Sequence, residues 1–358
     1  MRILFTGGGT AGHVTPNIAL IKRLLAEGWQ VDYVGSKTGI ERELIAGVPG
    51  VTYHAISSGK LRRYFSWQNF ADPFRIVRGV FEARRLIRAC KPDVIFSKGG
   101  YVSVPVVVAA GKTPVVAHES DFSPGLANRI AARYADRVCV TFADTARHIS
   151  GGRAVHTGTP IRPELYGGDR DRALAFTGLS GDKPVLLVMG GSSGAQRLNE
   201  LVRGALARLL PSFDVIHLCG RGKVDAAAAR PGYVQYEYID RELPDLLALA
   251  DIVLSRAGAN AVFEFLALAK PAVLLPLPLS ASRGDQIQNA KYFEKKGYAV
   301  MVDQDTATPD TVADAVAHLY ENRLVYHARM TGDAMLDGTD EVLREIREAA
   351  AGHRANGR

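Results

Sequence analysis

Short apolar runs alternate with amphipathic segments along the first half of the chain. We expect strands at Arg2–Thr6, Gln30–Val34, Asp93–Phe96, Val115–His118 and Val138–Thr141. The segments between these runs predict helices, for example Pro16–Glu27, Phe74–Ala89 and Pro124–Tyr134. This alternation is typical of a parallel sheet covered by helices on both faces.

The second half repeats the alternation. Its expected strands are Val185–Met189, Asp214–Leu218, Tyr233–Tyr236, Ile252–Leu254, Val273–Leu275 and Ala299–Val302, and the pattern over Asp310–Ala351 is helical. The stretch from Gly158 to Asp182 is rich in glycine, proline and charge, and it predicts the boundary between two α/β domains. The halves resemble each other in fold type and not in sequence.

Two glycine-rich turns each follow the opening strand of a half. The first is Gly7-Gly8-Gly9-Thr10-Ala11-Gly12-His13, and the second is Gly190-Gly191-Ser192-Ser193-Gly194-Ala195. Such turns point backbone N–H groups at a helix N-terminus toward an anion. They predict two nucleotide-type domains and a ligand rich in phosphate.

The first turn also matches the dinucleotide fingerprint, with glycines at positions 7, 9 and 12 and Asp32 twenty residues later. A dehydrogenase is therefore a rival interpretation. Against it, Asp32 lies inside the expected strand and not at its end. His13 follows the last glycine, where a helix N-terminus disfavours the imidazolium form and a neutral ring can act as a general base. The alternative is an ordinary capping or loop histidine.

Further polar loops follow the expected strands, where ligands of open α/β sheets bind. They are Ser97–Tyr101, His118–Asp121, Thr157–Arg162, Ser255–Asn260 with Glu264 behind it, and Pro276–Leu279 leading to Asp285–Asn289. Each taken singly could be an ordinary solvated loop, but together they indicate a binding surface. The Asp-x-Asp triplets at 169–171 and 303–305 lie in the expected linker and in a turn, so we predict no catalytic metal.

The composition of the 358 residues, 47% hydrophobic and 23% charged, is that of a globular protein. No apolar run approaches the ~18 residues of a spanning helix, and the N-terminal run Ile3-Leu4-Phe5 is far shorter than the apolar core of a signal peptide. Three scattered cysteines without a C-x-x-C pair indicate no disulfide framework or structural zinc, which favours a reducing, cytoplasmic setting. The net charge of +7 suits nucleic acid, anionic lipid or a diphosphate substrate.

The basic excess is concentrated between Lys60 and Lys91. This segment has nine basic residues against Asp72 and Glu82, a net +7 (9 − 2), with aromatic residues interleaved. An RNA-binding patch and a solvated helix with one packed apolar face are both compatible with this pattern.

Taken in order, the two glycine turns, His118-Glu119, Ser255-Arg256-Ala257-Gly258-Ala259 and Asp285-Gln286-Ile287-Gln288-Asn289-Ala290 resemble the MurG family of N-acetylglucosaminyltransferases over nearly the whole chain. The resemblance implies a GT-B fold, with two Rossmann-like domains whose parallel sheets face each other across a cleft. Residues 1–160 would form the acceptor domain and 161–334 the UDP-GlcNAc domain, with a helix at about 335–351 returning to the first. The implied reaction is inverting transfer of GlcNAc from UDP-GlcNAc to the 4-hydroxyl of MurNAc in lipid I, which gives the β-1,4-linked lipid II of peptidoglycan synthesis without a cofactor or metal.

The same resemblance assigns roles to residues. On the donor side Glu264 would hold the ribose, Ile239 and Arg256 the uracil, and Gln286 the sugar hydroxyls. The donor diphosphate would meet Ser192 and the backbone of Ala259, Asn260 and Ala261, with Arg162, Thr10, Gly12 and His13 reaching the same region.

On the acceptor side Gly8, Gly9, Thr10 and Gly12 would face the lipid-linked diphosphate, and His13 would be the base. The chain departs from the family at Ala11 (usually glycine), Asp121 (commonly asparagine) and Asp285 (commonly glutamine). Because the carboxylate of Asp121 could itself accept the proton or orient His13, it is a second candidate for the catalytic base.

A lipid acceptor changes the interpretation of the basic segment. Without a spanning helix, the enzyme would reach lipid I by docking on the anionic cytoplasmic leaflet. The expected membrane contacts are Arg62, Arg63, Phe65, Trp67, Phe74, Arg84 and Arg85. Other partners would be cell-wall synthesis proteins and not nucleic acid. The alternatives are a UDP-GlcNAc 2-epimerase, a GT-B transferase with another lipid acceptor, and a non-catalytic nucleotide-sugar-binding subunit.

Overall fold

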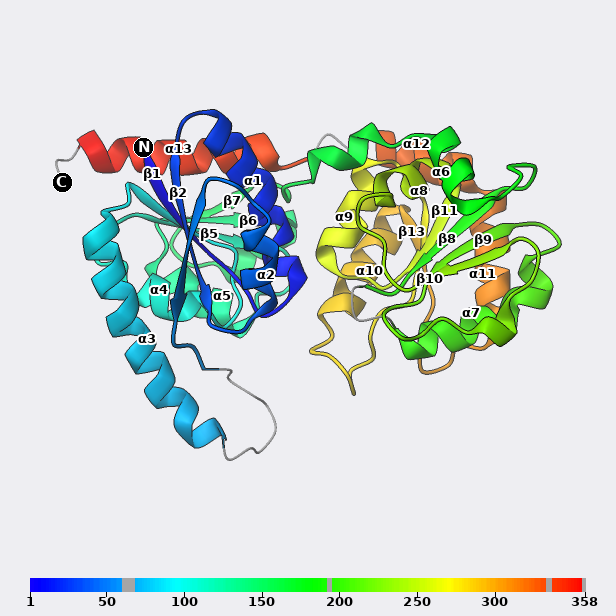
Figure 1. Ribbon diagram of the computed structural model, residues 1–358, viewed down its shortest axis with the longest axis horizontal. Coiled ribbons are helices and arrows are strands. Elements are labelled where there is room, and N and C mark those ends of the chain that lie inside the picture. Colours follow the sequence, from blue (N-terminus) through cyan, green and yellow to red (C-terminus); the bar gives the residue numbers. More distant parts are fainter. Residues whose placement is uncertain (60–67, 192–194, 333–336, 356–358) are drawn as a thin grey trace. The chain divides into compact units, whose positions relative to one another are not determined.

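The computed structural model describes residues 1–59, 68–191, 195–332 and 337–355, with the backbone alone for 68–72. Contacts divide the chain into two units (Figure 1). Unit 1 comprises Met1–Arg162 with Asp337–Arg358, and unit 2 comprises Pro163–Leu336. The division lies two residues beyond the expected boundary at 160/161.

Unit 1 is built on a parallel sheet of seven strands in the order β3-β2-β1-β4-β5-β6-β7. The strands are β1 (Arg2–Thr6), β2 (Gln30–Ser36), β3 (Val51–Ile56), β4 (Val94–Ser97), β5 (Val115–Glu119), β6 (Arg137–Val140) and β7 (Ala154–His156). The helices are η1 (Ala11–His13), α1 (Thr15–Ala26), α2 (Ile40–Ala46), α3 (Gln68–Cys90), α4 (Ser103–Ala109), α5 (Leu126–Tyr134), η2 (Ala143–His148) and α13 (Thr339–Ala355).

Both faces of this sheet are covered, which explains why central strands such as β1 and β4 are mostly apolar and buried. Alternate side chains of β1 point to opposite faces. Ile3 and Phe5 pack with α1, α2 and α13, whereas Leu4 packs with α3, α4 and α5. Figure 1 shows α3 extending beyond the sheet, past α4.

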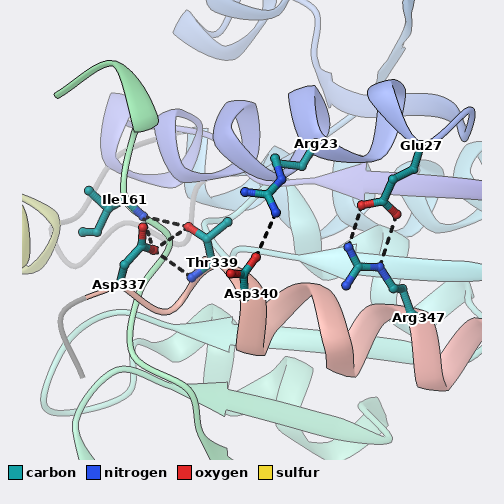
Figure 2. Close-up of polar contacts among 7 residues, drawn as sticks. All are labelled: Arg23, Glu27, Ile161, Asp337, Thr339, Asp340 and Arg347. Carbon is teal, nitrogen blue, oxygen red and sulfur yellow. Dashed lines mark hydrogen bonds and ion pairs between the residues drawn. The ribbon is translucent and has the colours of Figure 1, made fainter. Parts of the chain in front are cut away.

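Helix α13 belongs to unit 1 although the chain reaches it from unit 2. Its Val342, Leu343 and Ile346 are fully buried against α1 and the central strands. Polar contacts hold it in place (Figure 2): the Ile161 N–H donates to the Asp337 carboxylate at 3.3 Å and to the Thr339 hydroxyl at 3.2 Å. Arg347 pairs with Glu27 at 2.6 Å and Arg23 with Asp340 at 3.0 Å.

Unit 2 has a six-stranded parallel sheet in the order β10-β9-β8-β11-β12-β13. The strands are β8 (Val185–Met189), β9 (Asp214–Leu218), β10 (Tyr233–Tyr236), β11 (Ile252–Ser255), β12 (Ala272–Leu274) and β13 (Ala299–Met301). The helices are η3 (Pro163–Gly167), α6 (Arg170–Thr177), α7 (Gln196–Leu209), η4 (Ala226–Ala228), α8 (Leu243–Leu249), α9 (Ala259–Ala267), α10 (Asp285–Lys296), α11 (Pro309–Glu321) and α12 (Arg323–Thr331).

The expected α/β class with two parallel sheets is confirmed, and all eleven expected strands are present within a residue or two at each end. Two strands were missed, β3 and β7. Both lie at the edges of the sheet, where β3 is half-buried and β7 has only three residues, so neither shows the continuous apolar run of a central strand.

The interpretation of Gly158–Asp182 as a linker was wrong over part of its length. Residues 170–177 form α6, and the Asp169 carboxylate caps that helix by accepting from the Arg172 N–H at 2.7 Å. Within the described residues, every helix is too short or too polar to cross a bilayer.

Candidate functional site

The first glycine loop connects β1 to α1 through η1, and its geometry requires glycine. Gly9 has φ +90°, and a Cβ there would lie 2.6 Å from the ring of Tyr101. A Cβ on Gly7 would lie 2.7 Å from the His13 carbonyl oxygen. The loop is therefore folded tightly on itself and carries Thr10 and His13 at its exposed end.

His13 is oriented by Thr10. The Thr10 Oγ1 lies 2.8 Å from the His13 Nδ1, and the His13 N–H donates to the Thr10 carbonyl at 3.1 Å. When Nδ1 carries the proton and donates to the hydroxyl, Nε2 presents a lone pair. That tautomer is the one a general base needs.

The loop after β4 lies directly against the glycine loop. A Cβ on Gly100 (φ +81°) would meet the Gly8 carbonyl oxygen at 2.1 Å. The two loops border a cavity of about 410 Å³ within unit 1. It is lined by Gly8, Gly9, Thr10, His13, Gly59, Ile76, Gly100, Tyr101, Val104, Leu126 and Ala127. Four of the residues expected at the acceptor diphosphate or the base, at positions 8, 9, 10 and 13, thus share one cavity.

A buried polar cluster underlies the loops after β4 and β5. Lys98 Nζ donates to His118 Nδ1 at 2.7 Å, so the Nε2–H of that ring donates to the Gly158 carbonyl at 3.0 Å. The Glu119 carboxylate accepts from the Asn128 amide (2.9 Å) and from the backbone N–H groups of Gly125 and Asp121. These bonds fix the loop that contains Asp121, while the role of Asp121 as a base stays a prediction.

Burial governs the ionisation of this cluster. It lowers the pKa of Lys98 to about 7, and with the neighbouring Lys98 it holds the pKa of His118 well below its usual value. Burial also raises the pKa of the Glu119 carboxyl, and the nearby Asp121 carboxylate adds to the rise. His118 is therefore a neutral, structural histidine.

Glu41 on α2 is a residue that sequence reasoning missed. Its fully buried carboxylate accepts from the Gly9 N–H at 3.2 Å, the Ser36 N–H at 2.9 Å and the Ser36 hydroxyl at 2.5 Å. The Gly9 amide, expected at the acceptor diphosphate, is thus engaged inside the protein. The available signal was a glutamate in the segment beyond the expected second strand, seven residues after Val34 (41 − 34).

Asp32 plays no part in this site. It is buried in the middle of β2 and bonded to Arg2 (2.6 Å) and His54 (2.7 Å), near the amino-terminal ends of the strands. Burial acts to raise its pKa, but the bonds from Arg2 and His54 outweigh that effect and leave the pKa below its ordinary value. Asp32, His54 and Cys90 are close enough to hold a metal ion, but Arg2 already binds the carboxylate.

In unit 2 the expected donor residues gather around the N-terminus of α9. Gly258 is the N-cap and provides no side-chain bond. The first N–H groups of the helix, those of Ala259, Asn260 and Ala261, therefore have no intrahelical acceptor. A helix start of this kind stabilises an anion.

Neighbouring loops are bonded to this helix start. Arg256, which follows β11, donates to the Leu275 carbonyl at 2.8 Å, and burial lowers the pKa of its guanidinium. Gln286 Oε1 accepts from the Leu277 N–H at 3.0 Å, and Asn289 donates to the Ala257 carbonyl at 3.1 Å. The structure thus brings Arg256, Ala259 and Gln286 into one bonded group of loops.

The other residues expected to bind the donor come from several different segments of the chain. Glu264 is half-buried on the second turn of α9, Ile239 lies in the loop between β10 and α8, and Arg162 is the last residue of the first segment of unit 1. Ser192 lies outside the described residues. Gly190 packs so tightly that a Cβ would lie 2.7 Å from that of Ala195, which explains the glycine at this position.

Helix α3 has an unusual exposed face. Phe74 is 79% exposed, Phe81 69% and Val77 55%, and Arg84 and Arg85 are exposed on the same helix. The other expected membrane contacts, Arg62, Arg63, Phe65 and Trp67, lie outside the described residues. Ile76 of this helix lines the cavity beside His13.

Comparison with known proteins identifies the family. Residues 3–140 match the glycosyltransferase family 28 N-terminal domain, and residues 185–342 match its C-terminal domain. The UDP-N-acetylglucosamine--N-acetylmuramyl-(pentapeptide) pyrophosphoryl-undecaprenol N-acetylglucosamine transferase of Geobacillus thermodenitrificans is 49% identical over 98% of this chain and 99% of its own.

Solved structures agree in fold. The crystal structure of Acinetobacter baumannii MurG matches with a TM-score of 0.77 at 27% identity, covering 97% of this chain and 99% of its own. A putative UDP-N-acetylglucosamine 2-epimerase from Listeria monocytogenes shares the fold alone, with a TM-score of 0.69 at 12% identity over 100% of this chain and 97% of its own. The chain therefore belongs to the MurG family of family 28 glycosyltransferases.

Proposed function

We propose that this chain transfers GlcNAc from UDP-GlcNAc to the 4-hydroxyl of MurNAc in lipid I, which gives lipid II with a β-1,4 linkage. The observation that carries the proposal is the Thr10–His13 pair at the edge of a cavity in unit 1. It occurs in a chain 49% identical, over nearly its whole length, to a transferase named for these substrates.

The chemistry requires a proton acceptor and a stabilised leaving group. In the proposed mechanism Thr10 holds the Nδ1–H of His13, so that Nε2 removes the proton of the acceptor hydroxyl. The resulting oxygen nucleophile forms a bond to the anomeric carbon while the bond from that carbon to the diphosphate of UDP breaks. Attack opposite the leaving group inverts the anomeric configuration, through a transition state similar to an oxocarbenium ion.

The donor would bind to unit 2. The N–H groups at the start of α9, those of Ala259, Asn260 and Ala261, would receive the negative charge of the departing UDP, as preorganised donors do in other enzymes. Gln286 would contact the sugar and Glu264 the ribose. Ile239 and Arg256 would bind the uracil, with Ser192 and Arg162 contributing to the diphosphate site.

The acceptor would occupy the cavity of unit 1. Backbone atoms of Gly8, Thr10 and Gly12 would face its diphosphate, and Gly9 would offer only its open surface because its N–H is taken by Glu41. Ile76, Val104 and Leu126 make much of the lining apolar. Such a lining suits a substrate that carries a lipid chain.

Helix α3 would bring this cavity to the membrane. Its exposed Phe74, Val77 and Phe81 would enter the interface, while Arg84 and Arg85 would attract anionic lipid at about 1 kcal/mol per basic residue. We therefore place the enzyme peripherally on the cytoplasmic leaflet, where it would meet other cell-wall synthesis proteins.

The proposal is tested by incubating the protein with radiolabelled UDP-GlcNAc and a lipid I analogue in detergent micelles. We expect label in an organic-extractable product that a β-1,4-specific hexosaminidase releases. An epimerase would instead convert UDP-GlcNAc to UDP-ManNAc without acceptor. Label in diacylglycerol but not in lipid I would indicate the other transferase class, and either result would overturn the proposal.

A further inference from the structure

The contacts of Glu41 set it apart from the other buried acids of unit 1. It lies on the first turn of α2, and its side chain reaches back under the glycine loop. One carboxylate oxygen accepts from Gly9, and the other accepts from both the backbone and the hydroxyl of Ser36. A single buried side chain thus connects the end of β2 to the loop after β1.

Two side chains, those of Glu41 and Tyr101, pack closely against the first glycine loop. A Cβ on Gly8 would lie 2.7 Å from the Glu41 carboxyl carbon, and one on Gly9 would lie 2.6 Å from the Tyr101 ring. Tyr53 donates to the Ser36 carbonyl at 2.6 Å, which adds a further bond at the end of β2. The carboxylate therefore occupies the position where a bound phosphate would otherwise receive the Gly9 N–H of a nucleotide-binding loop.

The contacts of Glu41 also affect the end of the glycine loop that carries Thr10 and His13. Gly9 adjoins Thr10, whose carbonyl and hydroxyl both bond to His13. With Gly9 in the left-handed region, its N–H donates to Glu41, and the folded loop is destabilised when such a buried donor is left unpaired. A shift at Gly9 would move the Thr10 hydroxyl and the imidazole together, and about 1 Å of misplacement can reduce turnover about 100-fold.

We propose that Glu41 is a positioning residue: it acts as an internal anion that holds the first glycine loop, and with it Thr10 and His13, in the geometry for proton abstraction. This inference rests on the proposed function for its effect on turnover. It also explains how a loop with a dinucleotide fingerprint serves a different substrate, since its amide is satisfied without a nucleotide.

The test compares Glu41→Gln and Glu41→Ala with Glu43→Gln, a change at an exposed glutamate of the same helix. The amide of Gln would turn an N–H group toward one of the donors, and Ala would leave both sides of the bridge unpaired. We expect kcat to fall at least tenfold in Glu41→Gln and further in Glu41→Ala. The Kd for UDP, measured by calorimetry, should stay within twofold of the Glu43→Gln control.

A second readout does not need turnover. In a histidine-selective ¹⁵N–¹H spectrum, the ring signals of His13, assigned with His13→Asn, should shift in Glu41→Gln and not in Glu43→Gln. Unchanged His13 signals, turnover within twofold of the control, or a parallel loss of UDP binding would each overturn the inference. If the wild-type protein forms no lipid-linked product, the proposed function fails, while the His13 signals still decide the role of Glu41.

Discussion

His13 is the residue on which the proposed chemistry depends, and the Thr10 hydroxyl lies 2.8 Å from its Nδ1. We expect His13→Ala to lower kcat by about 100- to 10,000-fold, the range typical of a general base. Binding of UDP should change little, because the expected donor contacts lie mainly in unit 2. Stopped-flow or radiolabel turnover, combined with calorimetric titration of UDP, measures both.

Thr10→Val is the matched variant for this pair, since it keeps the shape of the side chain and removes only the hydroxyl. It should lower kcat less than His13→Ala does. Near-normal turnover in His13→Ala would remove His13 from the role of base and leave Asp121 as the candidate.

Lys98 allows a prediction, also for a single residue, of how the stability of the fold depends on pH. Its pKa is about 7 in the folded protein and near 10.5 when exposed, so the unfolded chain binds the extra proton between these values. Stability from this group therefore rises as the pH increases from about 7 to about 10. Urea unfolding at pH 7, 8 and 9 should show wild type gaining on Lys98→Met, whereas a difference that does not change with pH would contradict the assignment.

The role of an individual residue could be predicted only where its partners lie close to it in the sequence. The glycine loop and His13 stand next to each other in sequence, so their shared site was predictable. Glu41 was not, because its partners Gly9 and Ser36 come from two other loops and only the order of the strands brings them together. Asp32 illustrates the reverse: its spacing suggested ribose binding, and its burial against Arg2 excludes it.

At the scale of elements, α3 presents an apolar stripe to solvent. Phe74, Val77 and Phe81 are spaced so that they share one helical face, and all three are exposed. Because burying one phenylalanine contributes roughly 1.5–3 kcal/mol, Phe74→Ser with Phe81→Ser should reduce partitioning to anionic vesicles at least tenfold. Vesicle sedimentation measures this directly.

The control is Leu324→Ser, which removes a side chain that is 73% exposed on α12 of unit 2. It should leave partitioning unchanged. Charge reversal at Arg84 and Arg85 should weaken binding mainly at low salt. Equal binding by all the variants would contradict the docking role of α3.

Elements were predictable to the extent that their own sequence carries the pattern. Central strands such as β1 and β8 are continuous apolar runs and were found with the observed bounds. The edge strand β3 is mostly half-buried or exposed, so its identity depends on pairing with β2, which no local pattern records.

For the whole molecule, the division into two units predicts two unfolding transitions. Ile346 is fully buried between α13 and the sheet of unit 1, and Ile346→Ala should lower the stability of that unit by about 3 kcal/mol. UDP should raise the melting temperature of the other transition, because a ligand stabilises the unit that binds it. Differential scanning calorimetry separates the two effects.

The contrary result is a single unfolding transition that Ile346→Ala and UDP both shift. It would mean that the two units unfold as one cooperative body, and stability could then not be assigned to either alone. Ala351→Ser, at an exposed position of α13, serves as the control for Ile346→Ala and should shift neither transition by more than a degree or two.

The place of α13 also sets an order of events during synthesis on the ribosome. Unit 2 is one continuous stretch, Pro163–Leu336, and can complete its core as soon as it emerges. Unit 1 begins first but lacks Val342, Leu343 and Ile346 until the segment after unit 2 is translated. Domains usually mature from the N-terminus onward. Here unit 1 must wait for a segment that follows unit 2 in the sequence, so a nascent chain keeps the part of its first sheet that α13 covers open to chaperones until unit 2 has been made.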